Sequence, residues 1–164
     1  CNIVLKYTGK ETLTGGRILR LKKYIGDEDF LLTYGDALSN INIKKLITFH
    51  KKNKGIVTVS AVRPPVRFGE LLISKNNTVN EFKEKPQSAN NWINGGFFVM
   101  KSGIFNYLKN DKTILERNPL ASLSVQKKLK AFKHYSFWQC MDTMRDKILL
   151  NKLWSKGLAK WKKW

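Results

Sequence analysis

The sequence predicts an α/β fold with an inserted antiparallel portion. Strand-like apolar stretches alternate with amphipathic helical stretches through the first third of the chain. Short strands joined by tight turns follow in the middle, and the end of the chain is helical. With 164 residues and 42% hydrophobic content, the chain can bury one sizeable core. We therefore expect a single domain or a large piece of one.

The formal net charge of +19 raises the question of a nucleic acid or an anionic surface as partner. Of the 31 basic residues, 25 are Lys and 6 are Arg, and most are scattered singly or in pairs. Bidentate recognition of phosphates and bases favours Arg. We therefore do not expect a nucleic acid partner, although a basic nucleic-acid-binding module stays open as an alternative function.

Membrane and disulfide signals are both weak. No apolar run approaches the length of a membrane span, so no membrane association is expected. Cys1 and Cys140 are too few for a disulfide framework, and they have no metal-ligand spacing with His50 or His134. A reducing, cytoplasmic location fits these features best.

The chain is expected to open with a strand over Asn2–Tyr7. A helix should follow from Thr14, a plausible N-cap, with Ile18, Leu21 and Ile25 on one face. Its free backbone N–H groups can receive an anion, although an ordinary capped helix with glycines for close packing explains the pattern better.

The stretch Phe30–Asp36 is the main basis for predicting a metal-binding site. Four largely apolar residues indicate a buried strand, which ends in Gly35 and Asp36. A carboxylate at the C-terminal edge of such a strand can hold Mg²⁺ while the metal keeps waters and takes phosphate oxygens. The alternative is that Asp36 caps the next helix or bends a turn.

The next elements alternate again. Residues 43–53 form an amphipathic helix in which His50 is better explained as a packed core residue than as a ligand. Residues 56–62 read as a β-branched strand. After a loop, residues 70–74 and 79–85 form a hairpin that Pro86 ends.

Two charged residues and two glycines mark the middle of the chain as a binding region. Glu84 and Lys85 stand where the hairpin strand leaves the sheet, so the lysine can meet a sugar phosphate and the glutamate can accept from sugar hydroxyls. Trp92–Met100 is an aromatic strand interrupted by Gly95 and Gly96. Glycine weakens a strand unless something must approach the backbone closely, which indicates a sugar ring against Asn94–Gly96.

The last third supplies a second carboxylate. Helices are expected over residues 102–108 and 118–127, and a strand over residues 130–135. Asp142 then precedes a helix that runs from Thr143 to about Lys156. Asp142 is either the N-cap of that helix or the second carboxylate of a phosphate-bound Mg²⁺. The face of that helix is expected to consist of Ile148, Leu149, Lys152 and Leu153.

Several short motifs occur together in the order of a known family. They are Thr14-Gly15-Gly16-Arg17, Thr33-Tyr34-Gly35-Asp36, Arg67-Phe68-Gly69, Glu84-Lys85-Pro86, Ile93-Asn94-Gly95-Gly96-Phe97-Phe98 and Phe137-Trp138 through Met141-Asp142-Thr143-Met144-Arg145-Asp146-Lys147. Taken together they resemble the sugar nucleotidyltransferases over nearly the whole chain. The resemblance implies a partial nucleotide-diphospho-sugar transferase fold, with a Rossmann-like mixed sheet, an antiparallel sugar-binding portion and C-terminal helices.

The resemblance also implies an activity and its catalytic residues. The activity is nucleotidyl transfer from CTP to glucose 1-phosphate, which gives CDP-glucose and pyrophosphate for the dideoxysugars of surface polysaccharides. Asp36 and Asp142 match the aspartates that bind Mg²⁺, and Lys85 matches the lysine on the sugar phosphate. The family assembles into homo-oligomers.

The same resemblance suggests contacts to the two substrates. Glu84 and Asn94 match sugar hydroxyl contacts, beside Gly95, whereas Thr12, Arg17 and Gly35 match positions near the nucleotide.

The resemblance further predicts how the chain divides. Residues 1–62 form the remainder of the nucleotide-binding core, residues 63–136 the sugar-binding portion, and residues 137–164 the second metal aspartate with the C-terminal helix. Family members begin with a strand and a Gly-rich loop that have no match here, so the N-terminal third of the fold is expected to be absent. An inactive fragment that retains sugar-phosphate and metal contacts is therefore an alternative function.

Overall fold

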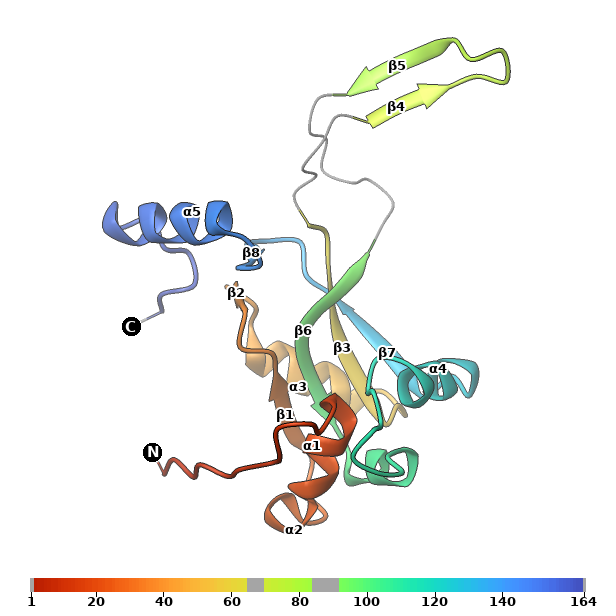
Figure 1. The fold of residues 1–164 in the computed structure, drawn as a ribbon, viewed down its shortest axis with the longest axis vertical. Helices are drawn as coiled ribbons and strands as arrows, with labels where there is room; N and C mark the ends of the chain where they lie inside the picture. The colour runs from red at the N-terminus through yellow and green to blue at the C-terminus, as the bar shows by residue number, and fades with distance from the viewer. Residues whose placement is uncertain (1, 65–69, 84–91, 164) are drawn as a thin grey trace. The chain divides into compact units, whose positions relative to one another are not determined.

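The structure is a computed structural model that describes residues 2–64, 70–83 and 92–163 (Figure 1). The chain divides into two compact units. The first comprises Cys1–Thr33, Ile43–Val59 and Phe97–Phe132. The second comprises Tyr34–Asn42, Ser60–Gly96 and Lys133–Trp164. Each unit is thus assembled from three stretches that are separated in sequence.

Helices and strands are interspersed along the chain, in agreement with the predicted α/β class with an antiparallel portion in the middle. The helices are α1 (Thr14–Arg20), α2 (Lys22–Ile25), α3 (Ile43–Lys52), the 3₁₀ helix η1 (Ser102–Tyr107), α4 (Asn118–Val125) and α5 (Met144–Ser155). The strands are β1 (Phe30–Thr33), β2 (Ala37–Ser39), β3 (Val57–Val62), β4 (Glu70–Ile73), β5 (Val79–Lys83), β6 (Ile93–Met100), β7 (Leu129–Lys133) and β8 (Trp138–Cys140).

The main sheet has four strands in the order β1-β6-β3-β7. β1 pairs with β6 in antiparallel register, from Phe30 opposite Met100 to Thr33 opposite Phe97. Phe98 and Met100 have no exposed surface, so β6 supplies much of the core. β1 was expected to be buried, but Leu31 is half exposed, and among the described strands β1 pairs with β6 alone, at the edge of the sheet.

Helix α3 packs its apolar face in the first unit, as its spacing predicts. Leu46 and His50 are completely buried. The Nδ1 atom of His50 lies 2.8 Å from the Thr58 hydroxyl, which confirms the prediction of a packed core histidine. Burial lowers the pKa of His50, against a smaller raising effect from the Asp29 carboxylate.

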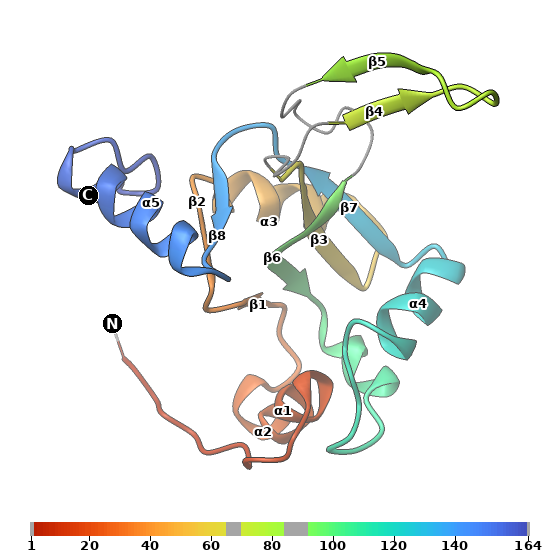
Figure 2. The same cartoon turned by 45° about the horizontal axis from the view of Figure 1, so that its top comes forward.

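Two antiparallel ribbons belong to the second unit. β4 and β5 form the predicted hairpin, with Glu70 opposite Lys83. β2 and β8 lie side by side, with Ala37 opposite Cys140 and Ser39 opposite Trp138 (Figure 2). The sequence did not predict the second ribbon, because strands of three residues carry almost no periodic signal.

Helix α5 begins with a capping box that the sequence contains but we did not assign. The Thr143 side chain accepts from the Asp146 backbone N–H, and the Asp146 carboxylate accepts from the Thr143 backbone N–H at 3.0 Å. The N-cap is therefore Thr143, and the capping interpretation of Asp142 was wrong.

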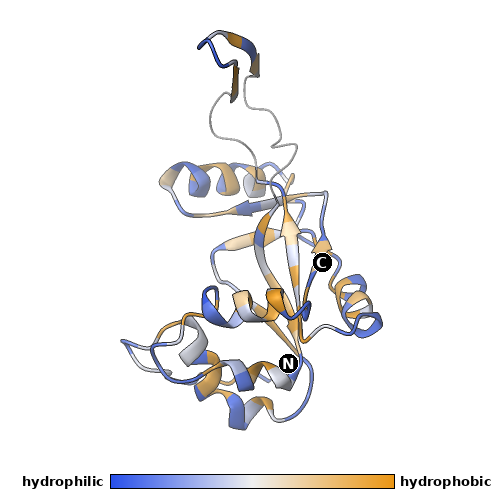
Figure 3. Cartoon of the chain, turned by 90° about the vertical axis from the view of Figure 1, so that its right-hand side faces the viewer, coloured by the Kyte–Doolittle hydropathy of each residue, from blue (hydrophilic) through white to orange (hydrophobic). Residues whose placement is uncertain are grey.

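The buried face of α5 also differs from the prediction. Asp146 and Leu150 are buried, whereas Ile148 and Leu149 are 60% and 42% exposed. Figure 3 shows hydrophobic and hydrophilic residues alternating along this helix. A pattern with apolar residues on several sides does not identify which side is buried.

Two predictions near the N-terminus were wrong. Asn2–Tyr7 forms no strand, and Ile3, Leu5 and Tyr7 are more than 80% exposed. Apolar alternation cannot make a strand without a neighbour to pair with, and this segment pairs with none of the described residues.

Thr14 does not cap α1, because the N-cap is Leu13. The Thr14 hydroxyl instead donates to Glu116 at 2.7 Å and accepts from the Leu115 backbone N–H at 2.9 Å. Its hydrogen-bonding capacity is therefore used for tertiary contacts.

Within the described part of the chain, the helices are too short or too polar to cross a bilayer.

Candidate active site

The turn after β1 brings two carboxylates to neighbouring backbone positions. The Tyr34 N–H donates to the Gly96 carbonyl at 3.0 Å, and the chain then bends through Gly35 and Asp36 into β2. At the end of the β2–β8 ribbon, the Met141 N–H donates to the Asp36 carbonyl at 2.7 Å. Asp142 follows directly. The ribbon therefore places Asp36 and Asp142 at its same end.

These two carboxylates line a cavity of about 340 Å³ within the second unit. The cavity contains four of the residues that the sequence predicted for the site, namely Asp36, Asp142, Asn94 and Gly95. The other lining residues are Tyr34, Ala37, Pro64, Ile93, Gly96, Trp138 and Cys140. Gly35, which was also predicted, is exposed at the bend before Asp36.

The cavity is acidic although the chain is strongly basic. No Lys or Arg is among the described residues that line it. Both carboxylates belong to exposed residues, and within the described ranges neither side chain has a hydrogen-bond or ion-pair partner. Two such carboxylates suit a hard cation, because Mg²⁺ is usually held by one or two carboxylates, waters and substrate phosphates. A group of three or more His, Cys, Asp or Glu ligands does not occur in the described part of the chain.

The Asn94–Gly96 segment is held by contacts within the protein. A Cβ atom on Gly95 would lie 2.7 Å from both the Ser60 hydroxyl and a Val62 methyl group. Gly96 has a φ of 77°, and its N–H donates to the Asn94 side-chain oxygen at 2.9 Å. Close packing inside the protein therefore explains both glycines, and the sugar ring expected at this segment stays a prediction.

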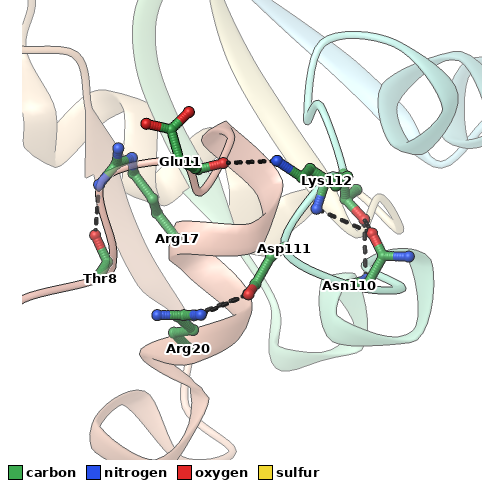
Figure 4. Close-up of polar contacts among 8 residues, drawn as sticks. Thr8, Glu11, Arg17, Arg20, Asn110, Asp111 and Lys112 are labelled. Atoms are coloured by element: carbon green, nitrogen blue, oxygen red, sulfur yellow. Dashed lines mark hydrogen bonds and ion pairs between the residues drawn. The ribbon is translucent and has the colours of Figure 1, made fainter.

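Thr12 and Arg17, the residues predicted near the nucleotide, belong to the first unit. Thr12 is buried. The Arg17 guanidinium donates to the Thr8 hydroxyl at 2.7 Å and to the Lys10 carbonyl at 3.3 Å. Arg17 therefore fixes the segment before α1 (Figure 4).

The loop after η1 contacts both ends of α1. The Arg20 guanidinium donates to both Asp111 carboxylate oxygens and holds the pKa of that carboxyl below its usual value (Figure 4). Gly16 packs so closely on this loop that a Cβ atom would lie 2.5 Å from the Asp111 carbonyl oxygen. This contact explains Gly16, and Gly15 is explained by Thr113, whose methyl group would lie 2.8 Å from a Cβ atom there.

Glu84 and Lys85 lie outside the described residues. Tyr34 and Trp138 line the cavity, but we did not assign either residue to the site from the sequence. A signal for Trp138 is present, because Trp138, Cys140 and Asp142 are spaced by two residues and so share one side of an extended segment.

Comparison with known proteins identifies the family. The family model described as nucleotidyl transferase matches residues 2–152. The chain belongs to the nucleotidyl transferase family.

Within this family, the chain is similar to glucose-1-phosphate cytidylyltransferases. It is 45% identical to that of Salmonella typhimurium over 164 residues, which cover 99% of this chain and 63% of the relative. It is 43% identical to the probable glucose-1-phosphate cytidylyltransferase of Bacillus subtilis over 158 residues, covering 96% of this chain and 61% of that protein. The chain thus spans less than two thirds of the length of these relatives.

Solved structures of this nucleotidyl transferase fold confirm the predicted fold class. HddC from Yersinia pseudotuberculosis superposes with a TM-score of 0.61 at 24% identity, covering 87% of this chain and 63% of that one. A Bacillus anthracis protein solved in complex with sucrose superposes with a TM-score of 0.64 at 17% identity, covering 95% of this chain and 64% of the other. At these identities the likeness concerns the fold.

Proposed function

We propose that this nucleotidyl transferase chain is part of an enzyme that transfers the cytidylyl group from CTP to glucose 1-phosphate. The products are CDP-glucose and pyrophosphate. The observation that carries the proposal is the 45% identity to a glucose-1-phosphate cytidylyltransferase over 99% of the chain. The acidic cavity supports it, because Asp36 and Asp142 line the same space as Asn94 and Gly95.

Mg²⁺ is the proposed cofactor, with Asp36 and Asp142 as its protein ligands. When bound, the ion would neutralise phosphate charge and polarise the reacting phosphoryl group. The acidic cavity in a chain of net charge +19 fits this role, because the two carboxylates attract a cation and would repel an unaccompanied triphosphate.

The residues of the chain would act mainly by positioning the substrates. In the proposed reaction, a phosphate oxygen of glucose 1-phosphate forms a bond to the α-phosphorus of CTP while the bond from that phosphorus to the pyrophosphate oxygen breaks. Asn94 and Gly95, with Glu84, would hold the sugar, and Lys85 would meet its phosphate. Thr12, Arg17 and Gly35 would lie near the nucleotide. Alignment for in-line attack then supplies much of the catalysis.

We further propose that the enzyme works in the cytoplasm as a homo-oligomer and supplies CDP-glucose for surface polysaccharide. In the proposed division of the chain, residues 1–62 contribute to nucleotide binding and residues 63–136 to sugar binding. Residues 137–164 carry the second metal aspartate.

The direct test is release of pyrophosphate from CTP and glucose 1-phosphate with Mg²⁺, using the protein expressed from its full reading frame. Release should require both substrates, and Asp36→Asn should reduce it at least a hundredfold, since a charged ligand of the reacting complex is lost. Glu28→Gln removes an exposed carboxylate in the first unit and is the matched control.

Two results would contradict the proposal. Binding of glucose 1-phosphate without any turnover would favour the inactive alternative. Sequence-independent DNA binding with a steep salt dependence, again without turnover, would favour a basic nucleic-acid-binding module.

A further inference from the structure

Trp138 links the carboxylate-bearing ribbon to the segment proposed to hold the sugar. Its indole Nε1–H donates to the Gly95 carbonyl at 2.8 Å. Trp138 is half-buried and lines the same cavity as Asp36, Asp142 and Asn94. This hydrogen bond joins β8 to β6 beside the cavity, across 43 residues of sequence.

The position of Trp138 is itself fixed by the ribbon. Trp138 is opposite Ser39 in the β2–β8 register, and Ala37 is opposite Cys140. The same pairing continues to the hydrogen bond between Met141 and Asp36. The indole therefore originates from the element whose end carries both carboxylates.

The Gly95 carbonyl can be held in place because the backbone around it has little freedom. Ser60 and Val62 pack directly against the Gly95 backbone. On its C-terminal side, the Gly96 N–H donates to the Asn94 side chain, whose nitrogen lies 3.4 Å from the Tyr34 hydroxyl. The Trp138 hydrogen bond completes this set of contacts from the β8 side.

We infer that Trp138 is a positioning residue for the sugar phosphate. By holding the Gly95 carbonyl, it sets the place of Asn94 relative to the two carboxylates, so that a sugar bound at Asn94 presents its phosphate in register with the nucleotide. This role rests on the proposed function. It requires no contact between Trp138 and the reacting atoms.

The test is a comparison of KM values in the full-reading-frame protein. Trp138→Phe keeps an aromatic ring and removes the donor, and one such hydrogen bond corresponds to about a fivefold change in affinity. We expect KM for glucose 1-phosphate to rise by about this factor while KM for CTP stays within about twofold. Trp138→His restores a ring N–H and should recover part of the loss. Trp161→Phe is the matched control, because Trp161 stacks on Phe137 and a Phe ring preserves that contact.

The possible results distinguish a failure of the inference from a failure of the proposed function. An unchanged KM for glucose 1-phosphate in an active Trp138→Phe variant would overturn the inference alone, as would equal losses in the Phe and His variants. If the unmodified protein does not turn over CTP with glucose 1-phosphate, the proposed function fails and the inference fails with it. Trp138→Met is a second variant without the donor, for use if thermal unfolding shows that Trp138→Phe does not fold.

Discussion

At the scale of single residues, the Asn94 amide oxygen accepts from the backbone, and its amide nitrogen has two N–H donors, of which one is used within the protein. The Gly96 N–H can only donate, so the Asn94 atom that meets it at 2.9 Å is the amide oxygen. The amide nitrogen donates one N–H to the Tyr34 hydroxyl at 3.4 Å, in the lining of the cavity, which leaves its second N–H for a ligand. We therefore expect Asn94 to donate to a sugar oxygen.

The variant Asn94→Asp tests this donor role. It keeps an acceptor for the Gly96 N–H, so the thermal unfolding midpoint should change little. It also removes the donor and adds negative charge beside Asp36 and Asp142. KM for glucose 1-phosphate should therefore rise by about tenfold or more, since hydrogen bonds to charged groups are worth about 1.5–3 kcal/mol.

Asn94→Ala is the informative partner variant. It removes the acceptor as well, so it should lower the unfolding midpoint along with the affinity for the sugar. Full affinity for glucose 1-phosphate in Asn94→Asp would show that the amide nitrogen is not the group that binds.

His50 should make the stability of the protein sensitive to mild acid. Its folded pKa is lowered, first by burial and further by Lys101, against the raising effect of Asp29. In the unfolded chain the histidine pKa is about 6.5. Below that pH the unfolded chain therefore binds more protons than the folded chain. The unfolding free energy should be unaffected above about pH 6.5 and should fall below it by up to about 1.4 kcal/mol per pH unit.

The measurement is denaturant unfolding between pH 7 and pH 5, with His50→Gln beside the unmodified protein. The variant should show the shallower slope, because Gln does not titrate. His134→Gln is the matched exchange of an imidazole for an amide in the other unit. Equal slopes for His50→Gln and the parent protein would refute the assignment to His50.

At the scale of elements, the fit of β6 against β3 depends on the absence of a side chain at Gly95. A Cβ atom would lie 2.7 Å from a Val62 methyl group and 3.1 Å from the Ser60 carbonyl oxygen, and the carbonyl oxygen is backbone that cannot move aside easily. Gly95→Ala should therefore cost about 1–3 kcal/mol of stability by overpacking.

Gly103→Ala is the control for Gly95→Ala, because the nearest atom to its Cβ would be a methyl group of Ile56 at 3.7 Å, an ordinary contact. Denaturant unfolding of both variants measures the difference. A Gly95→Ala protein as stable as Gly103→Ala would mean that β6 and β3 separate more easily than their packing indicates.

The elements that the sequence predicted are those with a strong local signal. The amphipathic spacing of α3, the β-branched run of β3 and the turn between β4 and β5 each specify their structure without distant residues. The ribbon of β2 and β8 has no such signal, because its pairing joins residues about 100 apart. Asn2–Tyr7 shows the opposite error, a local strand pattern without a neighbour to pair with.

Local signals also explain which residues of the cavity could be proposed from the sequence. Asp36 and Asp142 could be predicted because each carboxylate follows an apolar stretch and belongs to a motif of the resemblance. Trp138 also belongs to a motif of the resemblance, but it received no role from the sequence, because the role that we propose depends on a hydrogen bond from its indole to a carbonyl in another strand. Tyr34 was missed for a related reason, since its importance comes from packing against Gly96.

At the scale of the whole molecule, an acidic cavity occurs in a chain of net charge +19. Random placement of so many cations would tend to surround any cavity with Lys, yet the described lining of this one contains only carboxylates as charged groups. Two carboxylates that line one cavity can attract a cation together. A cation held by both would bind only the folded chain, so metal binding should be linked to global stability.

This linkage gives a test that does not depend on turnover. A ligand that binds only the folded state at about 100 times its Kd raises the unfolding free energy by about 2.7 kcal/mol. We expect CTP with Mg²⁺ to stabilise the protein on this scale, and we expect EDTA to remove most of the effect. Asp36→Asn and Asp142→Asn should each abolish the Mg²⁺-dependent part. Glu28→Gln should retain the full response. If both Asn variants kept the Mg²⁺-dependent stabilisation, the metal would have to be bound elsewhere, and the two carboxylates of the cavity would then need a different explanation.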